Sequence, residues 1–150
     1  IVRYPTSSDL TEILRRTTTN VRIDPEKAAD GEMIRAMGEL AREVPIANHV
    51  SDYVVRVVLS THPENAEAAA SVRKYVRYGV SPRGAQAMVL GAKIRALLEG
   101  RLNVAIDDIR AVTFPALRHR LILNFEAEAG GVTADDVLKS LMQDMPETAA

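Results

Sequence analysis

The stretch GVSPRGAQAMVLGAKIRALLEG, residues 79–100, predicts a long helix with a marked beginning and end. Ser81 is a favourable N-cap, Pro82 suits the first helical position, and Gly100 suits the position just past the end. Arg83, however, stands in the first turn, where the partial positive charge of the helix N-terminus favours acidic residues. A guanidinium beside free helix N–H groups is suited to phosphate. Arg83 is therefore either a solvated surface residue or part of an anion site.

The composition favours one helical domain. The 150 residues suffice for a single domain, or for a small domain with an attached segment. Hydrophobic residues make up 47% of the chain and aromatic residues only 4%, so Ala, Val, Leu and Ile carry the apolar content. This favours close-packed helices over a β-sandwich. Cysteine is absent, which excludes disulfides and thiolate metal sites and fits a reducing compartment.

The chain shows no membrane or export signal. No segment has the run of about 18 apolar residues that a spanning helix needs, and no signal-peptide pattern opens the chain. We therefore expect no membrane partner and a cytoplasmic location. The chain begins at Ile1 without an initiator Met. We expect it to be a piece of a longer protein or a processed product.

Charge is unevenly distributed along the chain. The net charge of −1 gives no global attraction to nucleic acid. Residues 71–101 nevertheless hold seven Lys and Arg against Glu99 alone, a net charge of +6, so the other residues together carry −7. Such a basic run is either a solvated face or the surroundings of an anion site, and this one includes the helix start at Arg83.

Apolar spacing and capping residues predict an all-α helical bundle with at most short strands, near 1–4, 75–79 or 121–124. The VVRVVL run could be a strand by its β-branched content, but the apolar spacing around it favours a helix. We expect the helix at 82–99 to be the most buried, and residues 62–71 to be an exposed, mobile segment. The expected helices are Ser7–Arg16, Glu32–Arg42, Ala47–Thr61, 82–99, Ile106–Val112, Pro115–Leu121 and Ala134–Met145.

Two of these helices carry specific expectations about which side chains face inward. Four residues of the 32–42 helix fall on one face and are expected to be buried: Met33, Ile34, Met37 and Leu40. In the 47–61 helix the inward positions are Val50, Tyr53, Val54, Val57 and Val58.

Most residues that could carry chemistry have a simpler explanation. The three histidines, His49, His62 and His119, lack the spacing of metal ligands. The pairs Asp107-Asp108 and Asp135-Asp136 suit first helical turns, where they complement the dipole. No GxxxxGK[ST] phosphate loop and no nucleophile elbow occur. Two features remain: Arg83 with its neighbours, and the run Arg118-His119-Arg120, whose cations could simply complement a helix C-terminus.

Four blocks of the sequence, in this order, resemble the carboxyl-terminal part of MoxR-type AAA+ ATPases. The most specific is the Ser-Pro-Arg segment followed by a long Ala-rich helix. One departure is Ala105-Ile106, where the family commonly has Thr-Pro, so the N-cap there is poorer. The blocks are YPTSSDLTEIL (4–14), REVPIANHVSDYVVRVV (42–58), YVRYGVSPRGAQAMVLGAKIRALLEGR (75–101) and DDIRAVTFPALRHRLIL (107–123).

The resemblance implies a helical lid that packs over a nucleotide held by an α/β core of the same chain. Residues 1–20 would be the end of that core and a connecting helix, and residues 21–150 the lid. Arg83 resembles the sensor 2 residue that reaches the γ-phosphate, and Ile13 would lie near the adenine. The complete protein would bind ATP and Mg²⁺. This chain lacks the phosphate loop and the Mg²⁺-binding motif, so alone it is expected to be inactive and without cofactor.

Family membership further implies a homo-hexameric, chaperone-like ATPase, often working with von Willebrand factor A-domain proteins to mature other complexes. The isolated chain is expected to be monomeric or weakly associating. The alternative is a free-standing helical interaction module whose basic patch binds an acidic protein. A small helical DNA-binding domain is disfavoured by the net charge of −1, so no nucleic-acid partner is expected.

Overall fold

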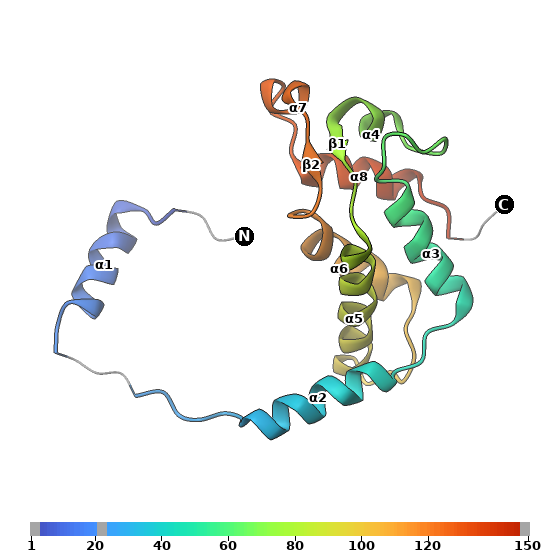
Figure 1. Ribbon diagram of the computed structural model, residues 1–150. Coiled ribbons are helices and arrows are strands. Elements are labelled where there is room, and N and C mark those ends of the chain that lie inside the picture. The colour runs from blue at the N-terminus through green and yellow to red at the C-terminus, as the bar shows by residue number, and fades with distance from the viewer. Residues whose placement is uncertain (1–3, 21–23, 148–150) are drawn as a thin grey trace. The chain divides into compact units, whose positions relative to one another are not determined.

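The computed structural model describes residues 4–20 and 24–147. The chain forms two compact units, Ile1–Ile34 and Arg35–Ala150. The predicted all-α fold is confirmed, because the described residues form helices and one small two-stranded sheet (Figure 1). The elements are α1 Ser7–Thr17, α2 Gly31–Glu43, α3 Asn48–Leu59, α4 Ala70–Tyr75, β1 Val76–Tyr78, α5 Pro82–Leu98, α6 Ile106–Leu117, β2 Ile122–Leu123, α7 Phe125–Ala129 and α8 Ala134–Asp144.

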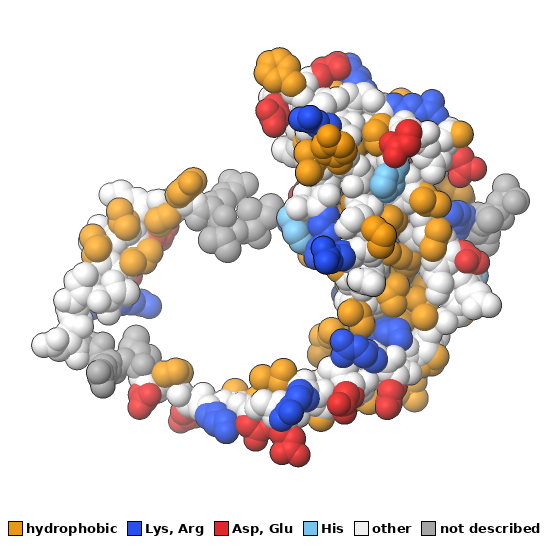
Figure 2. Space-filling model, in the orientation of Figure 1, with side chains coloured by type: hydrophobic (Ala, Val, Ile, Leu, Met, Phe, Trp, Pro, Cys, Tyr) orange, Lys and Arg blue, Asp and Glu red, His pale blue; other side chains and the backbone are white. Residues whose placement is uncertain are grey.

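The first unit contains α1, which begins with a capping box. The Thr6 hydroxyl accepts from the Asp9 N–H (3.3 Å), and the Asp9 carboxylate accepts from the Thr6 N–H (3.0 Å). No residue of α1 is buried, and its apolar side chains are exposed (Figure 2). Of the strand predicted near 1–4, residues 1–3 lie outside the described residues, and Tyr4 is in no strand. The predicted division between core and lid at residue 20 stays a prediction.

The core of the second unit is built mainly on α3, α5 and α6. All five predicted inward residues of α3 are buried, so the helical interpretation of the VVRVVL run is confirmed. In α5, Met88, Ala92 and Ala96 are fully buried, and the helix packs against both α6 and α3. A Cβ built on Gly91 would lie 3.4 Å from a Val112 methyl, so small residues let α5 approach α6 closely.

Two expectations about burial are wrong. The α2 face formed by Met33, Ile34, Met37 and Leu40 is exposed, and Ala41 is the buried residue of that helix. The amphipathic pattern shows that one face of the helix is apolar, but it does not show that other residues of this chain pack against that face. The 82–99 helix is also not the most buried: α3 and α6 each bury five residues and the longer α5 four. Its Leu90 and Ile94 are exposed.

The predicted break before Pro115 is also wrong, because α6 continues through it to Leu117. Pro115 removes one helix hydrogen bond, but only two helical residues follow it, so the loss affects just the end of α6. The expectation that residues 62–71 are exposed throughout is also corrected, because Ala68 is buried and α4 begins at Ala70. The mobility of that segment stays a prediction. The strands predicted near 75–79 and 121–124 are confirmed as β1 and β2, which pair antiparallel.

Candidate functional site

Arg83 lies in the first turn of α5 with an exposed side chain. Ser81 occupies the N-cap position as predicted, but its side chain makes no capping hydrogen bond, and the first turn contains no acidic residue. Within residues 4–20 and 24–147, the Arg83 guanidinium has no hydrogen-bond or ion-pair partner. The helix start therefore combines partial positive charge with an unpaired cation, the combination that an anion would stabilise.

The other cations of the basic segment are mostly paired within the chain. The partners of five of them are Ala66 O for Arg73, Glu126 for Lys74, Arg42 O for Lys93, Glu99 for Arg95 and Asp108 for Arg101. The Arg77 guanidinium lies over the Tyr78 ring, 5.2 Å from its centroid. Three of these five cations are thus paired with carboxylates and two with backbone carbonyls, whereas Arg83 has neither kind of partner among the described residues.

The chain just before Arg83 is held by the residues that follow α3. The buried Thr61 hydroxyl accepts from the Val80 N–H (2.9 Å), and the His62 ring Nε2 lies 3.0 Å from Val80 O. A Cβ on Gly79 would meet the His62 ring and Thr61 O at 2.8 Å. Contacts shorter than 3.0 Å are not tolerated by a real Cβ, so the segment 79–80 lies directly against the end of α3.

Gly84 lets the start of α5 pack against the end of α6. A Cβ at this position would lie 2.0 Å from Val80 Cγ1 and 3.1 Å from Leu117 Cδ2. Both neighbours are fully buried. Only a residue without a side chain fits here, which explains the glycine directly after Arg83.

The run Arg118-His119-Arg120 lies at the end of α6, close to this glycine. Arg120 donates to Ala116 O (2.5 Å), as expected for a cation that satisfies a helix C-terminal carbonyl, and its Nη1 also bonds the His119 ring. Arg118 pairs with Asp135 at 3.1 Å. These contacts support the structural explanation of the run.

Ile13, the other predicted site residue, lies on α1 in the first unit. Its side chain is exposed, together with Leu10 and Leu14 on the same helix. The predicted contact of Ile13 with adenine stays a prediction.

A buried carboxylate at the far end of α5 was not anticipated from the sequence. Asp108 is only 1% exposed; it accepts from Arg101 Nη1 (2.7 Å) and Nη2 (2.5 Å), and Arg95 Nε lies 3.4 Å away. It also accepts from the Ala105 N–H (2.9 Å), at the N-cap that lacks a capping side chain of its own. The Arg101 guanidinium holds the pKa of Asp108 below its ordinary value. Asp108 therefore joins the end of α5 to the start of α6.

We predict that Asp108→Asn lowers the free energy of unfolding by about 2 kcal/mol at pH 7, because hydrogen bonds to a charged group are lost. Since the folded-state pKa is lowered, the stabilisation is present above the unfolded pKa and is lost as the pH falls through the folded one. The difference between the two proteins should therefore shrink below about pH 4. Urea denaturation of the chain from pH 3 to 7 measures this. Asp107→Asn, in the same turn but exposed, is the control and should change stability by less than about 0.5 kcal/mol.

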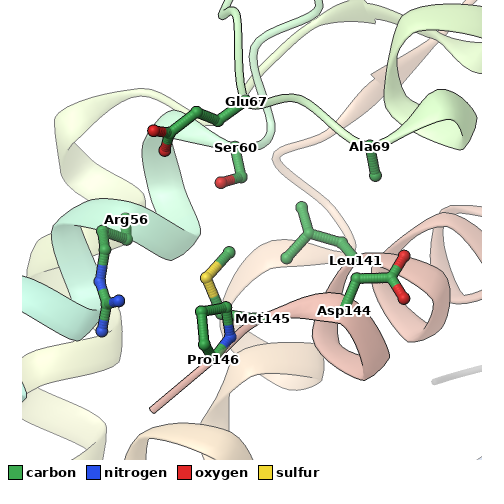
Figure 3. Close-up of a pocket in the computed structure, with 8 residues that line it drawn as sticks. All are labelled: Arg56, Ser60, Glu67, Ala69, Leu141, Asp144, Met145 and Pro146. Atoms are coloured by element: carbon green, nitrogen blue, oxygen red, sulfur yellow. The ribbon is translucent and has the colours of Figure 1, made fainter. Parts of the chain in front are cut away.

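Two hollows elsewhere in the second unit do not include Arg83. One, of about 420 Å³, lies between the end of α3, the segment before α4 and the end of α8 (Figure 3). Its lining mixes one cation with two carboxylates: Arg56, Ser60, Glu67, Ala69, Leu141, Asp144, Met145 and Pro146. The other, of about 610 Å³, is a mainly apolar groove between α3 and α5. The side chains that line these two hollows do not form a recognisable catalytic arrangement.

The described part of the chain contains neither a candidate metal site nor a candidate membrane span. No group of three or more His, Asp or Glu side chains there is placed to hold a metal ion. In the same residues, no helix is both long enough and apolar enough to cross a membrane.

Comparisons with known proteins connect this geometry to a family. Residues 68–141 match the AAA lid domain, the segment that contains Arg83. The chain is 30% identical over 142 residues to "Chaperone MoxR1" of Mycobacterium tuberculosis, covering 95% of this chain and 37% of that protein. It is 37% identical over 98 residues to "Protein MoxR" of Paracoccus denitrificans, covering 60% of this chain and 29% of that protein.

A solved structure agrees with the fold. A crystal structure from Cytophaga hutchinsonii, named as a candidate ATPase, superimposes with a TM-score of 0.78 over 99% of this chain and 45% of that protein, at 24% identity. The chain spans less than half the length of each of these relatives. It belongs to the MoxR family of AAA+ ATPases and contains the AAA lid domain of that family.

Proposed function

We propose that this chain serves as the lid of a longer MoxR-like AAA+ ATPase, here called the complete ATPase, with Arg83 as its sensor 2 residue. The observation that carries the proposal is the unpartnered, exposed guanidinium at an uncapped helix start, within residues 4–20 and 24–147. The anion that Arg83 contacts would be the γ-phosphate of ATP held by a core domain of the same polypeptide. Residues 1–20 would end that core, and residues 21–150 would form the lid.

The chemistry asked of Arg83 is electrostatic. During phosphoryl transfer, negative charge spreads over the oxygens of the γ-phosphoryl group. A guanidinium can meet two of these oxygens at once, and the N-terminus of α5 adds partial positive charge from the same side. The core would supply Mg²⁺, which neutralises charge on the phosphates. Ile13, on the exposed apolar face of α1, would contact the adenine.

The wider role follows the relatives. One of them is named a chaperone, and we propose that the complete ATPase couples hydrolysis to maturation of partner complexes in the cytoplasm. It would act as a homo-hexamer, with a von Willebrand factor A-domain protein as a partner. The alternative, a free-standing module with a basic patch, is less well supported, because five of the seven cations of that segment have partners within the chain.

Nucleotide binding by the complete ATPase tests the role of Arg83. Arg83→Ala should weaken ATP binding about tenfold, the loss expected for one charge-assisted contact. ADP binding should change by less than twofold, since ADP has no γ-phosphate. Calorimetric titration with both nucleotides measures the difference. Arg77→Ala removes an exposed cation of the same segment and should alter neither affinity. Equal losses for ATP and ADP would contradict the assignment.

A further inference from the structure

We propose that Thr61 and His62, the two residues after the C-cap of α3, are positioning residues for Arg83. They bind both backbone polar groups of Val80, three residues before Arg83, and so fix where α5 begins. The inference rests on the proposed function of Arg83 and extends it to residues that would not touch the nucleotide.

Thr61 provides the first connection. Its side chain is fully buried; its hydroxyl donates to Val58 O (2.6 Å) in α3 and accepts from the Val80 N–H (2.9 Å). One hydroxyl thus joins the last turn of α3 to a segment 19 residues further along the chain. The buried Thr113 is different, because its hydroxyl bonds, among the described residues, only to Ile109 O of its own helix (2.7 Å).

His62 provides the second connection. Its Nε2 lies 3.0 Å from Val80 O, and because a carbonyl only accepts, the ring donates from Nε2. Its Nδ1 faces the Glu64 carboxylate at 3.4 Å. The ring also occupies the space beside Gly79 that a Cβ would need. Val80 is therefore fixed at its N–H, at its carbonyl and by the glycine before it.

Fixing Val80 fixes the first turn of α5. The Val80 side chain is fully buried and lies over Gly84, so a shift of Val80 must displace the helix start. The Arg83 side chain itself is exposed and has no partner in the described part of the chain. The protein therefore controls the guanidinium mainly through the backbone that carries it. Small displacements of a catalytic group are costly: about 1 Å can lower a rate 10²-fold.

The test is a set of turnover measurements on the complete ATPase. Thr61→Val keeps the shape of the side chain and removes the hydroxyl, and should lower kcat about tenfold. Thr61→Ser restores the hydroxyl and should recover at least half of the wild-type kcat. Thr113→Val removes a buried hydroxyl that does not contact the segment before Arg83, and should change kcat by less than twofold. Thermal unfolding establishes that each variant is folded.

The decisive measurement is the double variant. If Thr61 acts through Arg83, adding Thr61→Val to Arg83→Ala should lower kcat by less than a further twofold. The inference would be overturned if Thr61→Val lowered kcat by the same factor in the Arg83→Ala background as in the wild type. It would also be overturned if Thr113→Val lowered kcat as much as Thr61→Val, or if Thr61→Val left kcat unchanged. If Arg83→Ala alone leaves turnover unchanged, the proposed function itself fails, which is a separate result.

If Thr61→Val does not fold, a second variant, His62→Phe, tests the same proposal. His62→Phe keeps a ring beside Gly79 and removes the donor to Val80 O. It should lower kcat severalfold in the wild-type background and by less than twofold in the Arg83→Ala background. If His62→Phe lowered kcat by the same factor in both backgrounds, the inference would again be overturned.

Discussion

Replacing Arg83 with Ala is expected to lower ATP turnover by the complete ATPase about 10²-fold, the typical loss when one preorganised donor to the transition state is removed. The guanidinium is exposed, unpaired among the described residues and placed at a helix start without a capping side chain. It has no structural partner to lose, so the effect should fall on catalysis. Steady-state phosphate release at saturating ATP measures it.

Folding should be nearly unaffected by the same change. An exposed cation at the positive end of a helix dipole contributes little, and its removal slightly relieves repulsion, so stability should change by less than about 0.5 kcal/mol. Arg83→Lys keeps the charge but loses the two-pronged geometry, and should show an intermediate rate. Unchanged turnover in Arg83→Ala would mean that Arg83 is only a surface residue.

Gly84→Ala, one position further along α5, should destabilise the fold strongly, unlike Arg83→Ala. The new methyl group would be placed 2.0 Å from Val80 Cγ1 and 3.1 Å from Leu117 Cδ2, both in the buried core. Overpacking of this kind costs about 2–3 kcal/mol. Chemical denaturation of the 150-residue chain measures the free energy of unfolding.

The control for this prediction is a glycine in a helix with open space around it. A Cβ on Gly38 of α2 would meet nothing closer than Arg42 Nη1 at 3.8 Å. Gly38→Ala should therefore stabilise the chain by about 0.5–1 kcal/mol, through the higher helix propensity of Ala. Similar effects of the two substitutions would show that the packing around Gly84 is not as tight as described.

Local signals explain what could be predicted from the sequence. The spacing of Val50, Tyr53 and Val57 identifies α3 as a helix despite its β-branched residues, and all three are buried. The same kind of signal places Arg83 in a first turn, because Ser81 and Pro82 mark the start of α5. Each of these features depends on residues a few positions apart, so a single stretch of sequence contains it.

Features that depend on distant residues could not be predicted in the same way. The Asp108 carboxylate resembles an ordinary first-turn residue until folding brings Arg95 and Arg101 to it. The bonds from Thr61 and His62 to Val80 connect residues 18 and 19 positions apart. The exposed face of α2 shows the complementary limit, since an apolar pattern does not say which molecule covers it.

The contacts at the two ends of α5 have a consequence for how nucleotide state could be communicated. At its start, Val80 is bound to the residues after α3; at its end, Arg95 and the following Arg101 meet Asp108 of α6. A helix held at both ends turns together with its neighbours and cannot swing alone. If Arg83 contacts the γ-phosphate as proposed, moving the start of α5 away from that phosphate would therefore move the residues after α3 and the start of α6 with it. The occupancy of the γ-phosphate position would thus be reported by the orientation of a domain, a signal large enough for another protein to read.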